Sequence, residues 1–241
     1  MSRKFSAAFI AMALAIGAPV HAQFGGFGSM LSGGGGGEAD KLIASGVTII
    51  SFTTIATDLA VSSAMQMLEA FPPEKVAAIR EKFSKYNEIK AARGTDGQID
   101  SDSATLASEG FSEMEKLDPK SYRKEKAQVV GPAYTKLGLA LAADAVAATQ
   151  LPTFVSSGAK TISSIGSNPA VLLKVGKLKT IIGTVGVLAK SIPSQYKSIQ
   201  TVRAIAKKIG ESESVTIGEP KTTITALDPK LLAADVKEVE G

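Results

Sequence analysis

Apolar residues recur every three or four positions along most of this chain, which is the spacing that places them on one side of an α-helix. The clearest case begins at Pro73, directly after another proline, and ends near Arg93. Pro73 suits the first position of a helix because that position needs no backbone N–H donor. The pattern therefore predicts an amphipathic helix whose apolar positions are Val76, Ile79, Phe83 and Tyr86.

The preceding segment, residues 38–70, carries two conflicting signals. Eight of the eleven residues from 47 to 57 are β-branched, a composition that favours strands. The apolar positions nevertheless follow helical spacing, and Glu38 and Asp40 stand where acids favour the start of a helix. We predict one long helix. Its uncharged stretch, 42–57, is shorter than the about 20 residues of a membrane span, so it is expected to be a buried core helix.

Prolines divide the rest of the chain into predicted helices. Asp118-Pro119 predicts a helix start, since Asp caps free N–H groups and Pro fits the first turn. This helix is expected to kink or break at Gly131-Pro132, where proline removes a backbone hydrogen bond. About three helices should follow, divided by Pro152, Pro169 and Pro193. The chain is therefore expected to be all-α, an irregular bundle of about six to eight helices.

The N-terminal residues resemble a secretory signal peptide. Arg3 and Lys4 precede a short apolar run, 5–16, and Val20-His21-Ala22 ends it with small residues suited to cleavage. The apolar run falls short of the about 20 residues of a membrane anchor. We therefore expect an exported protein, periplasmic or extracellular, that begins near Gln23 and has lost its single histidine.

Four parts are expected along the chain. The signal peptide takes residues 1–22, and a glycine-rich disordered arm takes 23–37, because its five consecutive glycines cannot hold a regular element. A helical domain follows at 38–210, with a mixed-charge half, 38–150, and a basic half, 151–210. An acidic tail, 211–241, ends the chain with an exposed connector and a short helix after Asp228-Pro229.

The amino-acid composition excludes most kinds of catalytic site. The chain has no cysteine and no tryptophan, and cleavage would also remove its histidine, which leaves no ligand set for zinc and no base for a serine nucleophile. Ser121 and Lys124 match S-x-x-K but lack the companion elements of that motif. We predict a protein that is not an enzyme and binds no cofactor. The alternative is a hydrolase with an unrecognised Ser–Lys or carboxylate site.

Residues 96–100 resemble the middle of an EF-hand calcium loop, with Gly97 at the sixth position. Three ligand positions of such a loop are then lost, since they hold Ala92, Gly94 and Ser103. We predict a polar turn and no metal site, with Asp100 or Asp102 capping the next helix.

Charge is distributed in blocks. Residues 23–144 carry a net charge of −3 and the tail from Glu211 a net charge of −4. Between Asp144 and Glu211 there is no acid at all, and the cations there sum to +9. Such asymmetry indicates either an anionic partner or internal pairing, with the acidic segments packed around the basic one.

Lysines opposite an apolar stripe are typical of helices that lie on anionic membranes. We therefore predict a non-enzymatic protein whose basic helical half binds an anionic lipid surface or an acidic envelope component. A membrane-inserting protein that uses residues 42–57 and 180–189 is a further alternative. Nucleic acid is not expected as a partner, because the chain is exported and aromatic residues are not interleaved with the basic ones. The predicted binding residues are Lys174, Lys177, Lys179, Lys190, Lys207 and Lys208.

Overall fold

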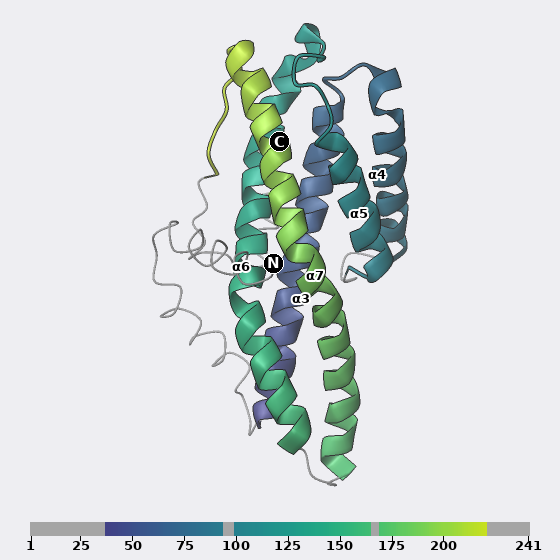
Figure 1. Cartoon of the computed structure of the whole chain (residues 1–241), viewed down its shortest axis with the longest axis vertical. Coiled ribbons are helices and arrows are strands. Elements are labelled where there is room, and N and C mark those ends of the chain that lie inside the picture. The colour runs from purple at the N-terminus through teal and green to yellow at the C-terminus, as the bar shows by residue number, and fades with distance from the viewer. Residues whose placement is uncertain (1–36, 94–98, 165–168, 221–241) are drawn as a thin grey trace.

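The computed structural model describes residues 37–93, 99–164 and 169–220, and within them every regular element is helical (Figure 1). The all-α prediction is therefore confirmed, although these residues form five α-helices and one 3₁₀-helix rather than six to eight. The signal peptide, the arm before Gly37 and the tail after Pro220 lie outside the described residues. The elements are α3 (Glu38–Leu68), α4 (Pro73–Arg93), α5 (Ser101–Met114), η1 (Lys124–Val129), α6 (Val130–Ser164) and α7 (Pro169–Ser212).

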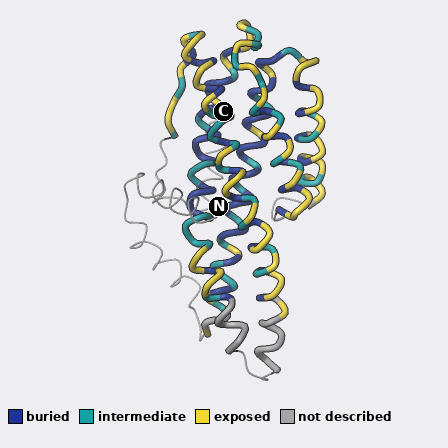
Figure 2. Tube along the Cα trace, viewed as in Figure 1, coloured by how far each residue is buried: buried dark blue, intermediate teal, exposed yellow. Residues whose placement is uncertain are grey.

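Three long helices, α3, α6 and α7, run the length of the molecule, and α4 and α5 form a hairpin beside one half of it (Figure 1). Helix α3 packs most extensively on α6, and the hairpin is attached mainly through α5, which packs on α7. Buried residues are concentrated in the half that carries the hairpin, and the described part of the other half shows more exposed positions (Figure 2).

Helix α3 forms despite its β-branched residues because its apolar face is buried against α6 and α7, and its threonine hydroxyls find acceptors within the helix. Thr53, Thr54 and Thr57 each donate to the carbonyl oxygen four residues earlier, at 2.8–2.9 Å. All three side chains are buried, and this bond gives each hydroxyl proton an acceptor within α3. The predictions of a helix and of a buried core segment at 42–57 are both confirmed.

The helix start expected at Asp118-Pro119 is wrong. The Asp118 side chain accepts the backbone N–H of Lys120 at 2.9 Å, which makes a turn instead. Helical structure begins at Lys124 with η1 and continues as α6 from Val130. Pro132 then falls in the first turn of α6, where a missing N–H costs nothing, so the expected break does not occur.

The expected divisions at Pro152 and Pro193 are also wrong. Both prolines lie inside long helices, Pro152 in α6 and Pro193 in α7. The apolar stripe of α7 continues past Pro193, from Leu188 and Ile192 to Ile199, and all three side chains are buried. We attribute the continuity to this packing, which outweighs the about 3 kcal/mol that an interior proline costs. The start of α7 at Pro169 agrees with the prediction.

Both helices of the hairpin begin where the sequence indicated. Helix α4 starts at Pro73, and Asp100 caps α5 by accepting the backbone N–H of Ser103 at 2.7 Å. Phe83 and Phe111 pack with their rings tilted by 59° and their centroids 5.2 Å apart across the hairpin. Gly110 allows this contact, because a Cβ there would lie under 3.0 Å from three atoms of the Phe83 ring. The two helices of the hairpin are therefore packed closely against each other.

Two helical stretches of the described chain, Asp40–Leu68 and Lys124–Gly158, are long and apolar enough to cross a membrane, judged by length and composition. Within the bundle, 56% and 50% of their most apolar windows are buried. A core helix of a bundle has the same length and composition, so this property alone does not distinguish a core helix from a span.

Candidate anion-binding surface

Four lysines form a stripe along the solvent side of α7, which we call the lysine stripe: Lys179, Lys190, Lys197 and Lys208. All four side chains are exposed. They are 11, 7 and 11 residues apart, which corresponds to nearly whole numbers of helical turns and places them on one side. The stripe extends about 44 Å along the helix. Its lysines form no ion pair with any residue that the structure describes.

The core determines which side of α7 the stripe occupies. The buried residues of α7 lie on the opposite side and face α3 and α6: Leu178, Ile181, Val185, Leu188, Ile192, Ile199 and Val202. Two glycines, Gly183 and Gly186, lie on the stripe side between Lys179 and Lys190, and a Cβ on either would contact nothing within 4 Å. The stripe is therefore unobstructed by neighbouring helices of the described chain.

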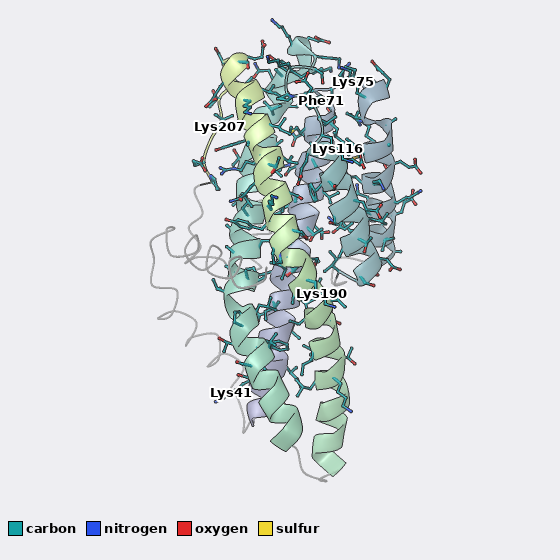
Figure 3. All side chains as sticks on the ribbon, viewed as in Figure 1. Lys41, Phe71, Lys75, Lys116, Lys190 and Lys207 are labelled. Atoms are coloured by element: carbon teal, nitrogen blue, oxygen red, sulfur yellow. The ribbon has the colours of Figure 1, made fainter. Side chains whose placement is uncertain are left out.

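The six predicted binding lysines have different positions. Lys179, Lys190 and Lys208 belong to the stripe, as does Lys197, which the prediction left out although it is equally exposed. Lys174 and Lys177 lie in α7, but their side chains are outside the described part. Lys207 is exposed and lies 3.8 Å from Glu211 (Nζ to Oε1). Figure 3 shows Lys190 and Lys207 on the middle and C-terminal parts of α7.

The chain reverses after α7, and residues 213–220, which we call the return segment, lie back along α6 and α7 (Figure 1). The reversal is made by Ser214, whose φ of 54° is in the left-handed region. The N–H of Val215 donates to the carbonyl of Gly210 at 2.8 Å, which closes the end of the helix. Val215 is buried, so the connector that the sequence predicted to be exposed is partly packed against the bundle.

Three glycines make room for the return segment. A Cβ on Gly131 would lie 2.6 Å from the carbonyl oxygen of Thr216. A Cβ on Gly138 would lie 3.0 Å from the Pro220 ring, and one on Gly210 would lie 2.8 Å from the side chain of Ile217. A larger residue at any of these positions would push the segment away from the helices.

The return segment brings Glu219 to Arg203 and Tyr134. The Tyr134 hydroxyl donates to Oε1 of Glu219 at 2.6 Å, and the Arg203 guanidinium pairs with Oε2. These two contacts lower the pKa of Glu219 below its usual value, the Tyr134 hydrogen bond most strongly. Burial, followed by the hydrogen bond to Glu219, raises the pKa of Tyr134. Glu219 is therefore ionised at neutral pH and acts as the anion bound by this pair.

Acids at the start of the tail pair with only the C-terminal end of the basic stretch. Glu219 reaches Arg203, Glu211 lies near Lys207, and Glu213 accepts the hydroxyl of Tyr122. The described acids therefore leave the lysine stripe itself uncovered.

A second polar cluster, buried between the three long helices, was missed in the sequence. Asp144 of α6 is fully buried, and Gln195 Nε2 of α7 lies 3.5 Å from its Oδ1. The same nitrogen donates to the hydroxyl of Thr57 of α3 at 2.9 Å. The other carboxylate oxygen, Oδ2, is buried and accepts no hydrogen bond from the described chain. A signal was present, since Asp144 is the one charged residue between Lys136 and Lys160.

Burial raises the pKa of Asp144 well above its ordinary value, and the Gln195 hydrogen bond opposes this only in part. Tyr196, on α7, has a pKa raised first by its own burial and then by Asp144. A carboxyl group in this environment favours its neutral form. The cluster is enclosed by three helices, so we assign it to the stability of the bundle.

The remaining sequence candidates lie apart from both clusters. The Ser121 hydroxyl donates to the carbonyl of Asp118 at 2.9 Å, and Lys124 is exposed. Residues 94–98 of the calcium-like loop lie outside the described ranges. Among residues 37–93, 99–164 and 169–220, no group of three or more Asp, Glu, His or Cys side chains could hold a metal ion.

Comparison with known proteins gives no relative: no family model, no curated protein and no solved structure matches this chain.

Proposed function

We propose that this chain is a non-enzymatic exported protein that binds an anionic envelope surface through the lysine stripe of α7. The observation that carries the proposal is an exposed row of cations on a helix that has no acid before Glu211. A flat anionic bilayer can contact such a row along its whole length. An acidic protein partner would be recognised by the same charges and is the competing outcome of the test below.

The spacing of the lysines supports additive binding. Neighbouring lysines of the stripe are about 10–17 Å apart along the helix, which is close to or beyond the Debye length of about 8 Å at physiological salt. They therefore repel one another little when free. Each lysine near an anionic membrane contributes about 1 kcal/mol, so the four together contribute about 4 kcal/mol, or about 1000-fold in binding.

Co-sedimentation with lipid vesicles tests the proposal. The wild-type chain is expected to bind vesicles that contain phosphatidylglycerol, to ignore vesicles of phosphatidylcholine alone, and to lose binding as salt rises. Replacing the four stripe lysines by glutamine should remove most of the binding. The control replaces four exposed lysines elsewhere, Lys75, Lys120, Lys124 and Lys126, and changes the net charge equally.

The control separates specific binding through the stripe from an effect of net charge. Equal losses in the two quadruple variants would show that only net charge matters and would refute the stripe. Absence of vesicle binding at low salt would refute the membrane surface as the partner. Binding of a soluble acidic protein with the same dependence on the stripe would then favour the competing outcome.

A further inference from the structure

We propose that Arg203 and Tyr134 form a second anion site, now occupied by the chain's own Glu219, and that the phosphate of an anionic lipid headgroup displaces Glu219 on the membrane. This inference rests on the proposed function, because it concerns the same basic helix and the same partner. It adds a specific headgroup site and a segment that must move before the site is filled.

Arg203 is held in place independently of Glu219. Its guanidinium carbon lies 3.9 Å from the centroid of the Tyr134 ring, and its Nε donates to the Tyr134 backbone carbonyl at 3.3 Å. Both contacts come from helix α6, so they remain when the return segment leaves. The fork of an arginine side chain matches the oxygens of a phosphate group, and the Tyr134 hydroxyl is a further donor. The site is therefore preorganised for an external anion.

Glu219 is a weakly held ligand. Its side chain is 71% exposed, so water competes for the Glu219 carboxylate, although the Arg203 side chain is only 20% exposed. Around it, Thr216, Gly218 and Glu219 are exposed, and Val215 alone of the return segment is buried. The turn at Ser214 also places an L-residue in the left-handed region, which is unfavourable. A segment with so few buried contacts opens readily.

The path of the return segment is nevertheless specific. Gly131, Gly138 and Gly210 clear its path, and the Thr135 hydroxyl donates to the carbonyl of Gly218 at 2.9 Å. The segment therefore has one defined closed position, in which Glu219 blocks Arg203. Displacement by a headgroup would free the Arg203 guanidinium, on the flank of α7 beside α6, to bind the phosphate.

The test uses the full chain and compares two variants with the same change in net charge. Glu219→Gln removes the resident anion, whereas Glu88→Gln removes an exposed acid of α4, far along the chain from the site. Binding to phosphatidylglycerol vesicles should rise about fivefold in Glu219→Gln relative to Glu88→Gln, the gain expected for one added cation near the surface. The double variant Glu219→Gln with Arg203→Gln should lose this gain.

Hydrogen exchange of the backbone amides in residues 215–219 gives a second measurement on the wild-type chain. Exchange should accelerate when phosphatidylglycerol vesicles are added and stay unchanged with phosphatidylcholine vesicles or inorganic phosphate. If the vesicles bind but exchange is unchanged and the two single variants bind equally, the headgroup site is wrong and the proposed function stands. If no variant binds vesicles, the proposed function fails as well. Opening by inorganic phosphate alone would identify a free anion as the ligand and overturn the headgroup.

Discussion

Replacing Asp144 by asparagine should stabilise this protein at neutral pH. The Asp144 carboxyl is fully buried, has one long contact with Gln195 at 3.5 Å, and leaves Oδ2 without a donor in the described chain. Because burial raises its pKa in the folded state, the folded protein holds a proton that the unfolded chain releases. Asparagine has the same shape as the protonated acid but does not titrate, so folding of the variant takes up no proton at this position.

The magnitude follows from proton linkage. The folded state binds more protons than the unfolded state between the unfolded pKa, about 3.9, and the raised folded pKa. Across that window the free energy of unfolding falls by about 1.4 kcal/mol for each unit of rising pH. Asp144→Asn loses this slope, so its advantage in unfolding free energy over the wild type should grow steadily with pH across that window.

Urea unfolding followed by circular dichroism, at intervals from pH 4 to pH 8, measures the effect. The difference in unfolding free energy between Asp144→Asn and the wild type should rise with pH, because all other titrating groups cancel. Glu88→Gln, which removes an exposed acid of α4, is the matched control for the loss of one carboxylate. A flat difference for Asp144→Asn would refute a buried neutral carboxyl.

Three further predictions concern glycine, the turn at Ser214 and the N-terminus. Gly46→Ala should destabilise the bundle by about 1–3 kcal/mol, because its Cβ would lie 2.7 Å from the Phe154 ring and would also clash with Ile181. Gly183→Ala is the matched control, because a Cβ at Gly183 meets open space and should stabilise helix α7 by about 0.5–1 kcal/mol. Thermal melts of the two variants show whether packing or helix propensity controls stability at Gly46 and Gly183. Ser214→Gly should raise the unfolding free energy by about 1 kcal/mol by removing the cost of a left-handed serine, and unchanged stability would show that the turn carries no strain. N-terminal sequencing of the exported protein should begin at or near Gln23, and recovery of protein that still begins at Met1 would contradict the signal peptide.

Local pattern was sufficient for the helices whose signals agree. Helical spacing correctly predicted that α3 is a helix despite its β-branched composition. Pro73 and Asp100 predicted helix starts that the structure confirms. These features depend on residues within a few positions of each other. A sequence displays such interactions directly, so the prediction did not need the tertiary structure.

The errors arose where tertiary packing overrides a local signal. Pro152 and Pro193 indicate helix ends, yet the buried faces on both sides of each proline keep α6 and α7 continuous. The exposed lysines of α7 followed from helical spacing, whereas the pairing of Glu219 with Arg203 joins residues 16 positions apart through a turn at Ser214. Nothing in the local composition of residues 211–226 indicates that contact. The partners of Asp144 were similarly hidden, because Thr57 and Gln195 lie on two other helices.

Glu219 is joined to the Arg203 site by a short stretch of the same chain, and this limits which anions can compete with Glu219 for the site. A ligand on a short tether meets its site at an effective concentration of the order of millimolar, however dilute the protein is. A soluble anion at micromolar concentration is therefore outcompeted by Glu219. A bilayer presents many headgroups side by side, at a local concentration far above that threshold. In the proposed mechanism, the return segment would therefore favour a surface dense in anions over the same anions free in solution.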